Sequence, residues 1–131
     1  MMGLAEKSSI SVQSLKTQRV IADKCLVRVR YLDRLRGLIG TRVLEPGSGM
    51  YFPNCNSIHM WFMSIPIDVV FVKKVATRDG KEIVQVTSVH SDVQAWRILP
   101  VSDFRAKDVL ELPVGTITKN EIKAGDELCL N

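Results

Sequence analysis

A chain of 131 residues has the length of one domain, and 46% apolar with 24% charged residues is an ordinary globular composition. No apolar run approaches the ~18 residues that span a bilayer, so the sequence predicts no membrane span. The net charge of +4 is modest, and no helix-turn-helix or RNA-binding strand pattern occurs, so we expect no nucleic-acid partner.

The first 17 residues contain four serines and lack the basic segment and apolar segment that mark a secretion signal. We therefore expect a flexible tail at 1–17, a single domain at 18–131, and a cytoplasmic location unless a signal peptide has been removed. The three cysteines are an odd number without CxxC spacing: Cys25, Cys55 and Cys129. Such a set is typical of a reducing compartment and not of a disulfide framework.

The first third of the domain predicts strands around one short helix. Residues 18–31 alternate between apolar and polar well enough for one or two half-buried strands. Five apolar residues at helical spacing then predict a short helix that ends at Gly40: Tyr31, Leu32, Leu35, Leu38 and Ile39. The Pro and Gly residues of 44–49 predict a turn, and 50–52 a brief strand.

The middle third predicts two central strands and a hairpin. The strands are 56–63 and 67–75, separated by a kink at Pro66, which has no amide hydrogen. Asp79-Gly80 predicts a tight hairpin turn into a strand at 82–89. Beyond it we expect 90–92 to leave the sheet, 94–100 to re-enter it, and 101–107 to form an exposed loop.

The last third predicts a strand at 109–112, a helical turn within 115–122 and a final strand at 128–130. The fold class is therefore mainly β, or α+β at most. We expect one compact β-barrel-like or folded-sheet domain of about seven or eight short strands with one or two short helices.

Asp68 is the most conspicuous candidate for a site, since it lies among Ile67 and the apolar run 69–72. A buried carboxylate is costly unless it is paired or hydrogen-bonded. Backbone amides near the Pro66 bend, or a salt bridge with Arg36 or Arg97, would satisfy it structurally. His59 is the other member of a conceivable acid–base pair, but no nucleophile motif accompanies it.

A metal site is the less favoured interpretation of the segment 55–63. Cys55, His59 and Met63 offer thiolate, imidazole and thioether, a set that suits Cu(I), and alternation places all three on one face of a strand. Three ligands on one straight strand would nevertheless span ~13 Å, too far for one ion. We expect no metal and no cofactor.

Trp96 and Arg97 form the third candidate feature, because Trp and Arg often anchor binding surfaces. The plainer interpretation is a tryptophan that closes one end of the barrel. His90 follows a predicted strand and is expected to face solvent in a polar loop.

Seven segments of the chain carry a pattern in a set order and spacing: 36–40, 49–52, 57–63, 65–72, 95–97, 109–115 and 125–126. In these segments the chain resembles the family of uncharacterised bacterial and archaeal proteins called domain of unknown function 192. The resemblance implies a compact, mainly β domain with short helices, and no established reaction. Many relatives have Phe-Trp-Met-Lys-Asn-Thr in the central motif, whereas this chain has Trp61-Phe62-Met63-Ser64 and lacks the lysine.

The sequence thus favours a non-catalytic binding module for a small ligand, a peptide or a partner protein. The expected ligand-binding residues are His59, Asp68, Trp96, Arg97 and Arg36. Two alternatives remain open: a hydrolase-like enzyme that uses Asp68 with His59, and an assembly or envelope accessory protein that acts through its basic surface.

Overall fold

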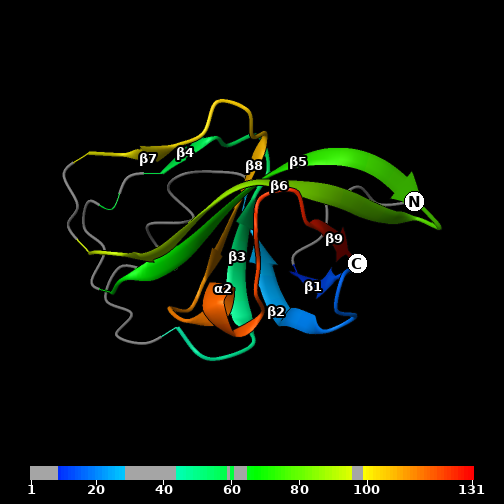
Figure 1. Ribbon diagram of the computed structural model, residues 1–131, viewed down its shortest axis with the longest axis horizontal. Helices are drawn as coiled ribbons and strands as arrows, with labels where there is room; N and C mark the ends of the chain where they lie inside the picture. Colours follow the sequence, from blue (N-terminus) through cyan, green and yellow to red (C-terminus); the bar gives the residue numbers. More distant parts are fainter. Residues whose placement is uncertain (1–8, 29–43, 59, 61–64, 96–98) are drawn as a thin grey trace.

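The computed structural model describes residues 9–28, 44–58, 60, 65–95 and 99–131. Within these residues, seven strands form a closed barrel (Figure 1). In their order around the barrel they are β1 (Ser9–Ser14), β2 (Val20–Val27), β3 (Ser48–Phe52), β8 (Asp108–Leu112), β5 (Ile67–Arg78), β6 (Lys81–Val93) and β9 (Glu127–Leu130). The fold is therefore mainly β and barrel-like, as predicted.

All neighbouring pairs in the barrel are antiparallel except β2 and β3, which run parallel. The pairing of β1 with β9 closes the barrel and brings Val12 opposite Leu130. A separate two-stranded sheet of β4 (Ser57–Ile58) and β7 (Val101–Ser102) lies to one side of the barrel (Figure 1). The short helix α2 (Thr116–Lys119) follows β8.

Strand β5 has buried side chains on both of its faces between Ile67 and Val72. Val70 and Val72 belong to one apolar cluster with inward residues of the other barrel strands, whereas Val69 and Phe71 belong to a second cluster that includes β4 and β7 residues. Because successive side chains point to opposite faces of a strand, β5 separates two cores. This explains why residues 67–72 are almost continuously apolar.

The hairpin between β5 and β6 forms at the predicted dipeptide. Arg78 pairs with Lys81, and the two residues between them, Asp79 and Gly80, have φ values of 52° and 78°. Positive φ at both central positions is the geometry that matches the twist of the flanking strands. Figure 1 shows this hairpin as a long ribbon that extends beyond the rest of the barrel.

The structure differs from the local expectations in four segments. Residues 9–14, expected in the flexible tail, form β1, because Ile10 and Val12 are buried and the backbone pairs with β2 and β9. β6 continues through His90 to Val93, so 90–92 do not leave the sheet, and Gln94 and Ala95 lie outside any strand.

The third and fourth differences concern the segments around the small sheet. The expected loop 101–107 contains β7 and buries Val101, Asp103 and Ala106. A strand was expected at 56–63. Among its described residues the structure has only the short strand β4, and Met60 lies outside that strand. The predicted helix at 31–40 lies outside the described residues. No helix among the described residues has the length and apolar character needed to cross a membrane.

Candidate ligand pocket

Asp68 lies at the start of β5 with 0% of its surface exposed. Its Oδ1 accepts a hydrogen bond from the Asp92 amide at 2.8 Å. Its Oδ2 accepts two more, from the Gly115 amide at 3.1 Å and the Ile117 amide at 2.9 Å. Three amide donors replace the water that burial removes, so the carboxylate is satisfied without an arginine among these partners.

The amide partners of Asp68 connect β5 to two irregular segments. Ile67 pairs with Val93 and Val69 with His90, so two β6 residues oppose Asp68 in a bulge, and one of them is Asp92 with φ 51°. The other partners begin α2, whose Ile117 packs into the barrel cluster. Asp68 therefore fixes both the bulge and the segment that carries α2.

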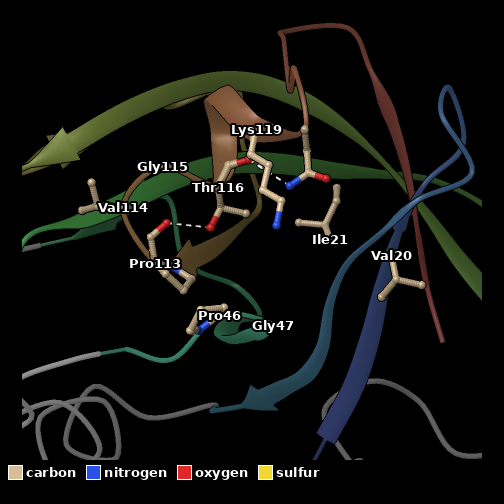
Figure 2. A pocket seen from close by; sticks show the side chains of 10 residues that line it. Val20, Ile21, Pro46, Gly47, Pro113, Val114, Gly115, Thr116 and Lys119 are labelled. Atoms are coloured by element: carbon tan, nitrogen blue, oxygen red, sulfur yellow. Dashed lines mark hydrogen bonds between the residues drawn. The ribbon is translucent and has the colours of Figure 1, made fainter.

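That segment also lines a pocket of about 340 Å³ (Figure 2). We call it the α2 pocket. Its lining residues come from the start of β2, the turn before β3, and the segment from the end of β8 through α2: Val20, Ile21, Pro46, Gly47, Pro113, Val114, Gly115, Thr116, Lys119 and Asn120. The volume is at the lower end of the ~300–1,000 Å³ typical of ligand pockets.

The rim of the α2 pocket is apolar and accessible. Val20 is 55% exposed and Val114 is 46% exposed, and both are among the few large apolar side chains that the described surface presents to solvent. Exposed apolar side chains that flank one concavity are typical of a binding site, whereas scattered ones are ordinary. This rim makes the α2 pocket the candidate site of the described chain.

Among the described residues that line the α2 pocket, Lys119 is the one with a charged side chain. Figure 2 shows its side chain extending from α2 into the space between Thr116 and Ile21. Thr116 Oγ1 donates to the Pro113 carbonyl at 2.7 Å, and Asn120 Nδ2 donates to the Thr116 carbonyl at 3.0 Å. These two bonds hold the wall of the pocket, whereas the Lys119 ammonium points into it.

The family comparison agrees with the resemblance drawn from the motifs. The family model DUF192, described as Uncharacterized ACR, matches residues 16–130. The chain belongs to the DUF192 family. No match is found among curated proteins.

Two solved structures are similar to this DUF192 chain in fold. One is a protein of unknown function from Novosphingobium aromaticivorans, with 21% identity and a TM-score of 0.70 over 92% of this chain and 82% of the other. The second, from Sinorhizobium meliloti, is described as "a putative transcription regulator" and has 21% identity and a TM-score of 0.71 over 94% and 95% of the two chains. At this identity the likeness supports the fold.

Most of the expected site residues of this DUF192 chain lie outside the described residues: Arg36, His59, Met63, Trp96 and Arg97. The structure therefore does not place them relative to Asp68. Cys55 is described, and its thiol donates to the Ser57 carbonyl at 3.1 Å. In the part of the chain that is described, no three His, Cys, Asp or Glu side chains are grouped as a metal site would require.

A polar cluster around Asp103 escaped the sequence interpretation. Its Oδ2 accepts from Thr87 Oγ1 and Ser88 Oγ, each at 2.7 Å, and Oδ1 accepts from the Arg105 amide at 3.0 Å and from Arg105 Nε at 3.1 Å. Burial alone would raise the pKa of Asp103, but hydrogen bonds from Ser88, Arg105 and Thr87 outweigh it and lower the pKa well below its usual range. The proximity of Asp103 and Arg105 in the sequence could have indicated an ion pair. The hydroxyl partners Thr87 and Ser88 lie 16 and 15 residues from Asp103, so the sequence gives no sign of their contact with it.

His90 lies beside this cluster and not in a solvent-exposed loop. Its Nε2 is 3.3 Å from Ser88 Oγ, and its ring meets Phe71 edge to face at 5.5 Å between centroids. Because Ser88 donates its proton to Asp103, the order is histidine, serine, carboxylate. A catalytic triad needs the histidine between the other two, so this arrangement does not activate Ser88 as a nucleophile.

Glu111 is a second fully buried carboxyl residue that sequence reasoning missed, with 0% exposure. It lies in β8 opposite Met50 of β3 and Val69 of β5. The signal was available, because Glu111 is flanked by Leu110 and Leu112 just as Asp68 is flanked by apolar residues. The argument from burial applies equally to both positions.

Proposed function

We propose that this DUF192 protein is a binding module that holds a small ligand, or the end of a peptide, non-covalently in the α2 pocket. The observation that supports this most is the coincidence of a concavity of about 340 Å³ with two exposed valines at its rim. A ligand that covers Val20 and Val114 removes apolar surface from water, which is the main driving force for such binding.

The wall of the α2 pocket is preorganised, which supports binding further. Asp68 holds the Gly115 and Ile117 amides, and Thr116 and Asn120 hold the backbone between Pro113 and Asn120. A wall fixed before the ligand arrives loses less conformational entropy on binding. In this proposal Asp68 is a positioning residue behind the wall and does not touch the ligand.

The composition of the pocket favours binding over catalysis. The described residues that line it include no His, Cys, Asp or Glu, and the Thr116 hydroxyl already donates to the Pro113 carbonyl. These acidic, imidazole and thiol groups are the usual proton-transfer groups of general acid–base catalysis, and Lys119 is the one ionisable side chain of the described lining. A hydrolase that uses Asp68 would need an accessible carboxylate, whereas this one is buried with three amide donors.

The test is a fragment screen by NMR on the wild-type protein and two matched tryptophan variants. Val114→Trp fills the rim of the pocket, and Val75→Trp places the same side chain on β5 at an equally exposed valine, 45% against 46%. We expect fragments that shift the amide resonances of Ile21, Gly47 and Gly115, and we expect Val114→Trp to lose them while Val75→Trp keeps them. A screen in which no fragment shifts these resonances contradicts the proposal.

A further inference from the structure

The α2 pocket carries information about the charge of its ligand, and this inference rests on the proposed function. Lys119 Nζ projects into the pocket, as Figure 2 shows. The Lys119 ammonium forms no ion pair or hydrogen bond within the described residues. An ammonium group has three donors and no acceptor, so the ligand atom that meets it must be an acceptor, and an anionic one binds best.

The other donors near the start of α2 are already in use. The Gly115 and Ile117 amides donate to Asp68, and the Thr116 amide donates to the Pro113 carbonyl at 3.1 Å. A phosphate group carries up to two negative charges and three acceptor oxygens, and it is held by clustered amides or several cations. Because Asp68 consumes the amides here and Lys119 is a single cation, the pocket matches one negative charge.

The apolar walls of the α2 pocket determine the chemistry of the uncharged part of the ligand. Val20, Ile21 and Val114, with the rings of Pro46 and Pro113, line the same pocket as Lys119. A single charge next to short aliphatic walls fits a carboxylate that bears a small branched alkyl group. We propose that the α2 pocket binds an aliphatic monocarboxylate, with Lys119 as the partner of the carboxylate group.

Two sources supply this chemistry: a free branched-chain acid and the C-terminal residue of a peptide. The probes that separate them are 4-methylpentanoate and the peptide acetyl-Gly-Leu with a free C-terminus, each compared with its neutral amide. Binding of the free acid without the peptide indicates a metabolite pocket. Binding of both indicates recognition of chain ends, because a peptide needs room for one further residue outside the rim.

The measurement is NMR titration at low salt of the wild-type protein, Lys119→Met and Lys123→Met. Lys123 follows α2 and is exposed, but it does not line the pocket, so it is the matched control. We expect the acids to bind about fivefold more tightly than their amides, the range of a solvent-accessible ion pair, and Lys119→Met to remove that difference. Lys123→Met retains it, and added salt reduces it.

If the neutral amide of each probe binds as tightly as the acid, the carboxylate assignment is wrong but the proposed function stands. Acids that keep their advantage in Lys119→Met overturn the role of Lys119. If neither acid shifts the Gly47 and Gly115 resonances while neutral fragments do, the ligand class is wrong and the binding module stands. If no fragment of any class binds there, both proposals fail together.

Discussion

The Oδ1 atom of Asp68 lies 2.8 Å from the amide nitrogen of Asp92, across a bulge in the hairpin of β5 and β6. A bulge leaves an extra residue out of the ladder, and its amide needs a partner when it is buried. The other oxygen of the same carboxylate holds α2. One side chain therefore ties the bulge of β6 to the wall of the α2 pocket.

Replacement of Asp68 tests this link. We expect Asp68→Ala to lower the free energy of unfolding by about 3 kcal/mol, because three amides lose a charged acceptor inside the protein. Asp68→Asn retains one acceptor oxygen and costs less. Urea denaturation measures the stability, and hydrogen exchange of the Asp92, Gly115 and Ile117 amides reports the local effect. Asp23→Ala, at an exposed aspartate of β2, is the control; equal losses in the two alanine variants would contradict this role.

The Asp103 cluster predicts a dependence of stability on pH. The pKa of Asp103 is lower in the folded protein than its usual value of 3.8, so the folded state favours the ionised form. Its contribution is complete above that usual value and is lost as the pH falls below it toward the lower pKa of the folded state. We expect Asp103→Asn to destabilise the protein at pH 7 and to flatten the acid side of the stability curve.

Thermal unfolding between pH 2 and pH 7 measures this contribution. Ser102→Ala is a neighbouring control, because the Ser102 hydroxyl contacts Ser57 and not Asp103. Parallel curves for wild type and Asp103→Asn across the whole range would show that the carboxylate adds nothing that depends on pH.

Gly49 is required by close packing between β3 and β8. A Cβ atom at this position would lie 2.9 Å from the Glu111 carbonyl oxygen and 3.1 Å from Leu112 Cδ2. Because a backbone atom cannot rotate away, we expect Gly49→Ala to lower the free energy of unfolding by about 2 kcal/mol. Lys24 is exposed on the adjacent strand, so we expect Lys24→Ala to change the free energy of unfolding by less than about 0.5 kcal/mol. A Gly49→Ala variant as stable as wild type would show that the strands separate at little cost.

The three thiols are predicted to differ in reactivity. Burial raises the pKa of the Cys25 thiol to about 12, so almost no thiolate exists at pH 8. Cys129 is also buried, whereas Cys55 is partly exposed beside a hollow lined by Asn54, Asn56, Ala106 and Lys107. We expect a disulfide reagent at pH 8 to modify one thiol per folded chain, at Cys55, and all three in urea.

Mass spectrometry of the labelled peptides identifies the site, and Cys55→Ser is the control that removes the fast reaction. Rapid modification of Cys25 in the native protein would show that the barrel opens on the time scale of labelling. Slow modification of all three thiols would mean that the Cys55 thiol is sequestered by its surroundings.

Local chemistry explains which parts of this fold were predictable. The Asp79-Gly80 hairpin follows from backbone preferences of two residues, and the strands of 67–75 and 109–112 follow from apolar runs. β1 was missed because it contains two apolar residues, Ile10 and Val12, and its third buried position is the polar Ser14, so the alternation is short. The β1 contact with β9 joins opposite ends of the chain, and no local pattern encodes it.

In the candidate site, the burial of Asp68 was predictable, but its hydrogen-bond partners and the α2 pocket were not. An aspartate among apolar residues indicated burial of Asp68, and the structure places it at 0% exposure. Its partners lie 24, 47 and 49 residues away along the chain and donate through backbone amides, which have no sequence signature. The α2 pocket was not foreseen, because its walls combine a strand end, a turn and a helix that only the tertiary fold brings together.

Closure through β1 and β9 also constrains how the chain reaches its native state. Residues 12 and 130 must meet before the ring of strands is complete, so the last hydrogen bonds of the barrel form only after β9 has been synthesised. Until then β6 and β1 each present an unpaired edge that another molecule can extend. We expect variants that lack 127–131 to aggregate, because they leave both of these edges unpaired.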